Sequence, residues 1–295
     1  MGNFDGVHLG HRVVIRRAVE EGLVRGMRCV VATFDPHPQA VLRPGSEPKL
    51  LTTPDVRKEL LLGCGVDEVC VIPFDGELAR KSPSDFVREV LAGELGAAVV
   101  VVGENFRFGY RASGDVNELG GWMREVGGEA IAVPIYALDE ALGESISSTK
   151  IRALLSNSEV AEAARLLGRP YTLRGEVVAG DSRGRTLGFP TANVLPDPRA
   201  LVPGRGVYAG HVRLPGGEFY GACTNVGLAP TFDDRRENRV EAYLLGYEGD
   251  LYGKVIDVTF VERLRPEQRF SGLDELKAQI ARDVAEARKV VDKDV

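Results

Sequence analysis

The chain has 295 residues, 44% of them hydrophobic and 27% charged, which fits an ordinary globular protein with two domains. A formal net charge of −6 argues against a broad surface for nucleic acid or an anionic membrane, whereas a small phosphate ligand needs only a local site. The sequence shows no signal-peptide pattern and no apolar run long enough to span a bilayer. Its four cysteines (Cys29, Cys64, Cys70 and Cys223) show no C-x-x-C spacing, so we expect free thiols in the cytoplasm and no structural zinc site.

The opening stretch, GNFDGVHLGH (Gly2–His11), places His8 and His11 at a glycine-bearing turn that leads into a helix. Gly22 is the expected end of this helix, which is predicted from apolar residues that recur on one face: Val14, Ile15, Ala18 and Val19. A helix N-terminus suits phosphate because its N–H groups are unpaired, and imidazoles there can donate hydrogen bonds to phosphoryl oxygens. The same pattern fits a plain capping turn with two surface histidines. Three of the four histidines lie in the first 37 residues, which favours a site.

Short apolar runs alternate with helical patterns in the rest of the first half. The predicted buried strands are Cys29–Phe34, Val66–Ile72, Ala97–Val102 and Ala130–Ile135. Helices are expected to begin after Thr53 and Ser82, where a hydroxyl residue is followed by proline, and to reach Leu62 and Leu91. This alternation predicts an α/β domain with a doubly wound parallel sheet.

Polar loops follow these strands, at the edge where an open α/β sheet binds its ligands. Asp35-Pro36-His37-Pro38 and Gly103–Gly109 are two of them, and the phenylalanines of the second form either a hydrophobic plug or a platform for a flat ring. Ile146–Arg152 has three hydroxyls and two cations, which fits either a well-capped helix or a phosphate site. The sequence has no G-x-x-x-x-G-K-[ST] motif. Histidines and a hydroxyl-rich helix start suit attack on an α-phosphate with pyrophosphate leaving.

Two further helices are predicted over Thr149–Leu155 and Val160–Leu167, and Gly168-Arg169-Pro170 ends the second of them. We therefore place the domain boundary at Gly168, which gives domains 1–168 and 169–295. Beyond it the hydrophobic period changes to two, with runs at Thr172–Ala179, Val207–Leu214, Phe219–Val226, Val240–Tyr247 and Ile256–Val261. Many short strands with glycine and proline turns predict a closed antiparallel β-barrel, followed by a helix capped by Ser271.

The second half contains a candidate site of its own. Gly180–Gly188 is a glycine-rich loop that can bring N–H groups against phosphate, and the hydroxyl of Thr191 and the amide of Asn193 then share one face of a strand. A mobile glycine hairpin before an ordinary strand is the alternative. Glu241 lies within a strand, a poor position for a carboxylate unless it is paired or active, and it can serve as a base that activates a hydroxyl.

At this point the sequence resembles the bifunctional prokaryotic riboflavin kinase/FAD synthetase family, from Gly2 to the C-terminal helix. The first-half matches are GNFDGVHLGH, TFDPHP (Thr33–Pro38), GENFRFG (Gly103–Gly109) and ISSTKIR (Ile146–Arg152). The second-half matches are GDSRGRTLGFPTAN (Gly180–Asn193), TNVGLAPTF (Thr224–Phe232) and VEAYLL (Val240–Leu245). All of them in this order are highly specific.

The resemblance implies a Rossmann-like nucleotidyltransferase domain followed by a riboflavin kinase barrel. The barrel is expected to phosphorylate riboflavin with ATP, with Glu241 as base and with Thr191 and Asn193 holding Mg²⁺ and the ATP phosphates. The N-terminal domain is then expected to adenylylate FMN with no protein base, because the FMN phosphate is already an anion. His8 and His11 are its expected catalytic residues. The expected ATP contacts are Gly2, Phe4, Asp5, Gly6, His8, His11, Ser147, Ser148, Thr149, Arg152, Gly180, Gly184, Gly188, Thr191 and Asn193. The expected flavin contacts are Asp35, His37, Asn105 and Phe106.

One departure from the family concerns the start of the chain. The family usually has a stretch before GNFDG that includes the first strand, whereas here Met1 stands directly before Gly2. We therefore expect Gly2 and Asn3 to lack the strand that would fix them, and adenylyltransferase activity to be the weaker one. The alternatives are a monofunctional riboflavin kinase with an impaired N-terminal domain and a non-catalytic flavin-binding or flavin-delivery protein.

Overall fold

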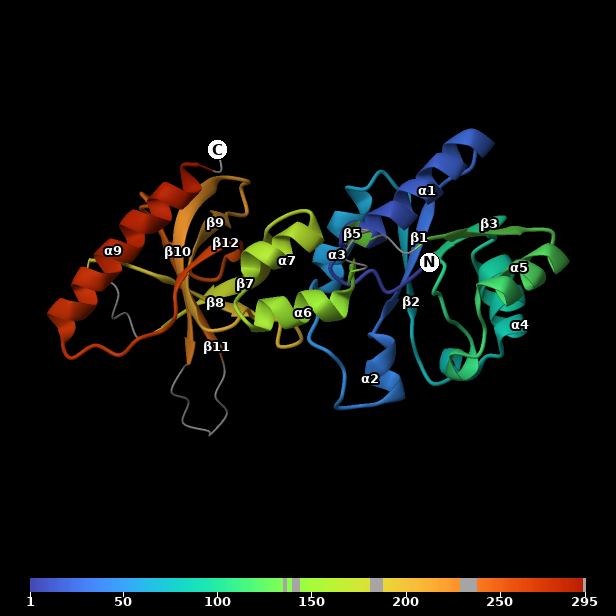
Figure 1. The fold of residues 1–295 in the computed structure, drawn as a ribbon, viewed down its shortest axis with the longest axis horizontal. Coiled ribbons are helices and arrows are strands. Elements are labelled where there is room, and N and C mark those ends of the chain that lie inside the picture. Colours follow the sequence, from blue (N-terminus) through green and yellow to red (C-terminus); the bar gives the residue numbers. More distant parts are fainter. Residues whose placement is uncertain (135–136, 140–143, 181–187, 229–237, 294–295) are drawn as a thin grey trace. The chain divides into compact units, whose positions relative to one another are not determined.

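The computed structural model describes residues 1–134, 137–139, 144–180, 188–228 and 238–293 (Figure 1). The chain divides into two compact units, Met1–Ser148 and Thr149–Val295, each described here by itself. The sequence places the boundary later, at Gly168, which does end a helix in the left-handed conformation (φ 69°). The difference arises because this helix, α7 (Val160–Leu167), packs on strands β7 and β12 of the second unit. No helix in the described ranges is long and apolar enough to cross a membrane.

The first unit is an α/β unit with parallel strands, as predicted. Its helices are α1 (Leu9–Arg25), α2 (Pro38–Leu42), α3 (Pro54–Leu62), α4 (Pro83–Asp85), which continues as a π-helix over Phe86–Glu94, and α5 (Val116–Glu125). Its strands are β1 (Val30–Asp35), β2 (Glu68–Pro73), β3 (Val99–Gly103), β4 (Glu129–Val133), β5 (Ala137–Asp139) and β6 (Glu144–Ser145). Strand β1 pairs in parallel with β2, and β3 pairs in parallel with β4.

Three helices of this unit differ from the sequence prediction: α1, α5 and the short α2, which was not predicted. Helix α1 runs through Gly22 and ends at Gly26, which takes the left-handed conformation (φ 65°). Gly22 is buried inside the helix, where a Cβ would lie 3.0 Å from the carbonyl oxygen of Met27, so the glycine lets the returning chain pass closely. Helix α5 was not predicted, although Asp115 and Glu118 form a capping box at its start.

The start of the chain lies between the two strand pairs. The backbone N–H of Gly2 donates to the carbonyl of Ala32 in β1 (3.1 Å), and the Met1 amino group donates to the carbonyl of Val101 in β3 (3.2 Å). Gly2 is therefore fixed to β1, contrary to the expectation from the sequence.

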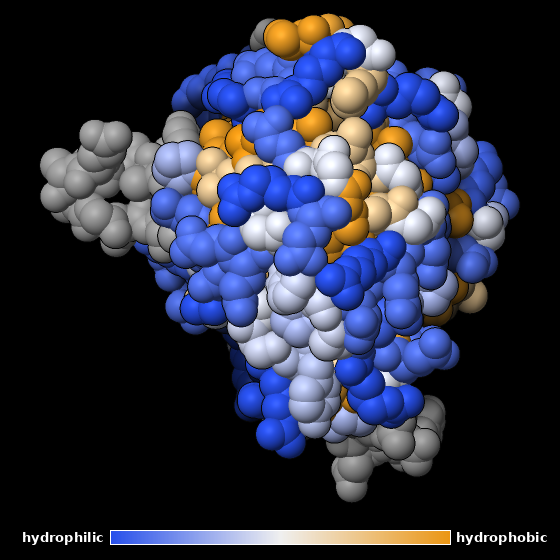
Figure 2. Space-filling model, turned by 90° about the vertical axis from the view of Figure 1, so that its right-hand side faces the viewer, coloured by the Kyte–Doolittle hydropathy of each residue, from blue (hydrophilic) through white to orange (hydrophobic). Residues whose placement is uncertain are grey.

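A cavity of about 570 Å³ lies between β1 and β3. On the face of the molecule seen in Figure 2, apolar residues gather in the middle and hydrophilic ones frame them.

The second unit is a closed antiparallel barrel with helices around it, which confirms the predicted fold class. Its strands are β7 (Tyr171–Val178), β8 (Ala192–Pro196), β9 (Gly206–Arg213), β10 (Phe219–Leu228), β11 (Asn238–Leu244) and β12 (Val255–Arg265), and its helices are α6 (Ser148–Ser156), α7 and α9 (Leu273–Val291). The strand order around the barrel is β10-β11-β8-β7-β12-β9. Helix α9 begins one residue later than predicted, with Gly272 as its N-cap, because Ser271 donates instead to the carboxylate of Glu275.

Helix α9 is fixed to the barrel by a buried ion pair. The guanidinium of Arg265 donates to the carboxylate of Asp283 at 2.9 and 2.7 Å, and Asp283 is only 5% exposed. Beneath the helix, Cys223 packs with Ala287 and with residues of β9. Burial raises the pKa of the Cys223 thiol to about 12, so this cysteine is a neutral core residue at neutral pH.

We expect Asp283→Ala to destabilise the second unit by about 3–5 kcal/mol, because it leaves the Arg265 guanidinium without its carboxylate. Urea unfolding followed by circular dichroism measures the loss. Glu286→Ala is the matched control, since Glu286 pairs with Lys289 on the exposed face of the same helix, and it should change stability by no more than about 0.5 kcal/mol. Equal effects of the two substitutions would contradict the anchoring role of Asp283.

Candidate active sites

A cavity of about 280 Å³ in the first unit brings together residues that the sequence singles out in three separate segments. The predicted site residues that line it are Gly2, Phe4, His8, His11, Asn105, Phe106, Ser147 and Ser148. The opening turn, the loop after β3 and the start of α6 therefore meet at one place. This convergence is what a phosphate site at the ends of parallel strands requires.

The two histidines form a stacked pair at the start of α1. His8 is the N-cap of the helix, and its Nδ1 accepts a hydrogen bond from the backbone N–H of His11 at 3.3 Å. In the neutral tautomer this bond leaves the proton of His8 on Nε2. The rings are 3.5 Å apart between centroids and nearly parallel. A Cβ at position 10 would lie 3.3 Å from the His8 ring, which explains the glycine between the histidines. The structure shows the capping role of His8, and the role of the motif in a phosphate site stays a prediction.

His11 is held in its neutral form. Burial lowers the pKa of His11 well below its ordinary value, and the charges of His8 and Arg57 lower it further. Its Nδ1 is buried and has no hydrogen-bond partner among the described residues. A neutral imidazole that faces the cavity has one N–H that can donate a hydrogen bond. It carries no positive charge, so it is not repelled by the Arg57 guanidinium.

This pKa shift predicts that the first unit loses stability in mild acid. Below the ordinary pKa of 6.5 the unfolded chain takes up a proton on His11 that the folded chain does not, so stability falls as pH falls. The loss attributable to His11 is about 1.4 kcal/mol for each pH unit below 6.5, down to the folded pKa. Fluorescence of Trp122, the single tryptophan, follows unfolding of this unit. His11→Gln should flatten the pH dependence between pH 7 and 5, and parallel curves for the two proteins would contradict it.

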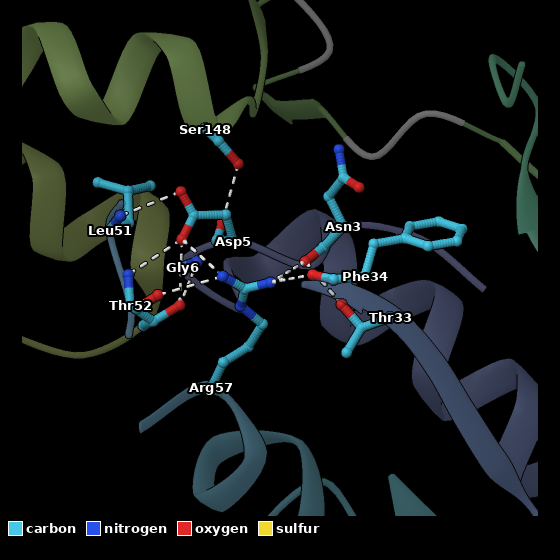
Figure 3. Close-up of polar contacts among 9 residues, drawn as sticks. All are labelled: Asn3, Asp5, Gly6, Thr33, Phe34, Leu51, Thr52, Arg57 and Ser148. Carbon is cyan, nitrogen blue, oxygen red and sulfur yellow. Dashed lines mark hydrogen bonds and ion pairs between the residues drawn. The ribbon is translucent and has the colours of Figure 1, made fainter. Parts of the chain in front are cut away.

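The opening turn is backbone-strained. Phe4 and Val7 have positive φ values of 49° and 42°, which cost about 1–3 kcal/mol each for residues with side chains. Such strain persists only where the surroundings hold it. Here the carboxylate of Asp5, 2% exposed, accepts hydrogen bonds from the backbone N–H groups of Leu51 and Thr52, both at 3.0 Å (Figure 3).

Other bonds fix the turn on both sides. The backbone N–H of Gly6 donates to the hydroxyl of Thr52 (3.0 Å), and the hydroxyl of Ser148 donates to the backbone carbonyl of Asp5 (2.8 Å) (Figure 3). The sequence predicts Asp5 and Gly6 as ATP contacts. Because the Asp5 carboxylate is buried against Leu51 and Thr52, we assign Asp5 to holding the turn.

The two phenylalanines of the loop after β3 have different surroundings. Phe108 is buried in the core against Phe86, whereas Phe106 lines the cavity and stacks on Phe108 with ring centroids 5.7 Å apart. Phe108 is therefore a hydrophobic plug, and a role of Phe106 as a platform for a flat ring stays a prediction. Of the other predicted flavin contacts, Asn105 lines the same cavity, while Asp35 and His37 do not. His37 instead caps α2, accepting a hydrogen bond from Gln39.

The hydroxyl-rich segment spans the division between the compact units. Ser147 and Ser148 line the cavity and belong to the first unit. Thr149 and Arg152 lie in α6 and belong to the second. Their contacts with ATP remain predictions.

In the second unit, Glu241 on β11 lies opposite Asn193 on β8 and Asn225 on β10. Arg239, two residues earlier on the same face of β11, bridges the predicted site residues. Its guanidinium donates to Asn193 Oδ1 at 2.9 and 2.7 Å and lies 3.1 Å from Glu241 Oε1. Arg239 is not among the predicted site residues, although the period of two that places Thr191 with Asn193 also places Arg239 with Glu241.

Gly180, the first residue of the glycine-rich loop, lies close to Asn193 of this cluster. A Cβ at Gly180 would lie 2.2 Å from Asn193 Nδ2, so a larger residue there would displace the Asn193 side chain. At the other end of the loop, Phe189 contacts Tyr243 edge to face with ring centroids 5.5 Å apart. Gly188 has φ 86°, a conformation that favours glycine, and Gly184 lies outside the described residues.

Asn193 and Glu241 supply oxygen atoms of the kind that bind a magnesium ion. In this structure Asn193 Oδ1 and Glu241 Oε1 both lie against the Arg239 guanidinium. The described residues contain no cluster of three or more histidine, cysteine or acidic ligands. Mg²⁺ typically takes one or two protein oxygens, with water and substrate phosphates completing its shell. Thr191 lines a neighbouring cavity of about 270 Å³ with Leu251 and Tyr252.

An α/β unit with imidazoles at a helix N-terminus, together with a barrel holding a carboxylate beside amide and guanidinium groups, defines an enzyme that acts on nucleotide phosphates. The comparisons narrow this class. A family model described as FAD synthetase matches residues 1–150, and one described as riboflavin kinase matches residues 167–291.

Relatives match nearly the whole chain. The bifunctional riboflavin kinase/FMN adenylyltransferase of Escherichia coli (strain K12) is 39% identical over 98% of this chain and 91% of its own length. That of Bacillus subtilis (strain 168) is 37% identical over 97% and 90%. A crystal structure described as a macrolide-efflux protein from Streptococcus pneumoniae has a TM-score of 0.88 at 32% identity, covering 98% of this chain and 92% of that one. The chain belongs to the bifunctional riboflavin kinase/FMN adenylyltransferase family, and a monofunctional kinase is not favoured.

Proposed function

We propose that the chain makes FAD from riboflavin in two ATP-dependent steps, one in each unit. The arrangement that carries this proposal is the pair of separate sites: stacked His8 and His11 in the part matched by the FAD synthetase model, and the Asn193–Glu241 cluster in the part matched by the riboflavin kinase model. The four cysteines are free, which supports the expected cytoplasmic location.

The barrel performs the first step. Glu241 takes the proton of the ribityl 5′-hydroxyl, whose oxygen attacks the γ-phosphorus of ATP, and ADP leaves. Asn193 and Thr191 hold Mg²⁺ and the phosphates. Gly180 has no side chain and so leaves room beside Asn193. When bound, Mg²⁺ neutralises charge on the transferred phosphoryl group. Arg239 keeps Asn193 and Glu241 oriented toward one point.

The first unit performs the second step. A phosphate oxygen of FMN attacks the α-phosphorus of ATP, the bond to the β-phosphate oxygen breaks, and pyrophosphate leaves. His8 and His11 donate hydrogen bonds to the charge that develops on the phosphates. Phe106 and Asn105 contact the flavin. No protein base is needed, because FMN brings an anionic nucleophile.

One assay tests the proposal. The purified chain is incubated with riboflavin, ATP and Mg²⁺, and riboflavin, FMN and FAD are then separated; a parallel sample contains EDTA in excess of Mg²⁺. We expect FMN followed by FAD, and neither product with EDTA. FMN alone would indicate a monofunctional kinase, and no product would indicate a flavin-binding protein. Full activity in EDTA would overturn the role of Mg²⁺.

A further inference from the structure

Arg57, in the first turn of α3, is a buried cation that the two proposed reactions leave unexplained. Its side chain is 3% exposed. The guanidinium donates to the carbonyls of Asn3 (3.1 Å) and Phe34 (3.4 Å) through Nη1, and to the carbonyl of Thr52 (3.3 Å) through Nη2 (Figure 3). Three segments far apart in the sequence therefore meet on one side chain.

Each of these three segments belongs to the structure around the cavity of about 280 Å³ in the first unit, which is the proposed adenylyltransferase site. Asn3 lies in the opening turn, between Gly2 and Phe4, which both line the cavity. Phe34 is near the end of β1, and Thr52 bonds to Asp5 and Gly6 of the turn. Figure 3 shows the guanidinium reaching toward the Asn3 and Phe34 carbonyls on one side and toward Thr52 and Asp5 on the other.

The distances favour positioning over a simple ion pair. Asp5 Oδ1 lies 3.9 Å from Arg57 Nη2, farther than any of the three carbonyl oxygens. A rigid fork of donors suits several fixed acceptors at once, which a lysine ammonium cannot match. Thr33 donates its hydroxyl to the same Asn3 carbonyl at 3.1 Å, so this carbonyl is held from two directions.

We propose that Arg57 is a positioning residue of the adenylyltransferase site, which fixes the Asn3 carbonyl and so holds the strained opening turn in register with His8 and His11. This role rests on the proposed function of the first unit. Arg57 does not line the cavity and acts on the substrate through the turn. Without it the turn can move by a fraction of an ångström, which lowers the rate of phosphate chemistry more than it weakens ATP binding.

The test compares Arg57→Met and Arg57→Lys with Lys58→Met in the full chain. Lys58 is the next residue of α3 and is exposed, so it controls for loss of a cation from the same helix. FAD formation from supplied FMN gives kcat and the KM for ATP, and FMN formation by the barrel is the internal control. Trp122 fluorescence shows whether the first unit is folded.

We expect Arg57→Met to lower kcat for FAD formation about 10²-fold with a smaller change in KM. Arg57→Lys should lie between Arg57→Met and wild type, and Lys58→Met should match wild type. If Arg57→Met does not fold, Arg57→Lys and Thr33→Val test the positioning role instead. Thr33→Val removes the second donor to the Asn3 carbonyl, so it should also lower kcat.

Two results would overturn the positioning role. One is a wild-type kcat, per folded molecule, in the Arg57 variants that fold and in Thr33→Val, with only the unfolding midpoint lowered. The other is an equal loss in Lys58→Met. A wild-type chain that forms FMN and no FAD contradicts the proposed function of the first unit itself, and the positioning role with it.

Discussion

Glu241→Gln should reduce FMN formation by about 10²–10⁴-fold, the usual contribution of a general base. Glutamine keeps the size of the side chain and one acceptor oxygen that can face Arg239, but it is uncharged and cannot accept the hydroxyl proton. FAD formation from supplied FMN should be unchanged, because that reaction belongs to the other unit. Separate assays from riboflavin and from FMN, each with ATP and Mg²⁺, measure the two rates.

Glu218→Gln is the matched control for this experiment. Glu218 is an exposed glutamate in the turn between β9 and β10, and its substitution should leave both rates as they are. A Glu241→Gln chain that retains a near-wild-type kinase rate would rule out Glu241 as the base. Loss of both activities together would point to misfolding.

His8→Ala and His11→Ala should each lower FAD formation by about 10²–10³-fold, as expected when one preorganised donor to developing charge is removed. FMN formation should persist in both variants. His8→Ala also removes the N-cap bond to the backbone of His11, so it is expected to cost about 1 kcal/mol of stability in addition. Each rate is divided by the fraction of folded molecules, which Trp122 fluorescence measures. This separates the loss of activity from the loss of stability.

His211→Ala serves as the histidine control, since His211 lies on β9 of the barrel. It should leave FAD formation from FMN unchanged. Normal specific activity in His8→Ala and His11→Ala, with only stability lost, would show that the motif is a capping turn alone.

Local patterns in the sequence were sufficient to predict most elements. Helix α7 matches its predicted span, and five of the six strands of the barrel lie within a few residues of the period-two runs, the exception being β8. These predictions succeed because hydrophobic periodicity and capping residues act within a few positions of the chain. Gly22 was misjudged because its role depends on the chain returning past Met27, which no local pattern records.

The candidate site residues likewise divide into those that local patterns indicate and those that they do not. The residue types at strand ends and on strand faces were enough to single out His8, His11, Asn193 and Glu241 as predicted site residues. Arg57 was not, since burial of an arginine depends on carbonyls contributed by residues 3, 34 and 52. The contact of Asp5 with ATP stays a prediction, and its carboxylate accepts hydrogen bonds from the backbone of Leu51 and Thr52, which the sequence does not indicate.

The position of Cys223 under α9 has a practical consequence. A buried thiol whose pKa is raised to about 12 reacts only very slowly with alkylating agents while the helix stays docked. Modification of Cys223 therefore requires the helix to lift from β9 and β10. Peptide mapping distinguishes Cys223 from the more exposed Cys64 and Cys70. The rate of its alkylation thus records how often the C-terminal helix opens in the unaltered protein.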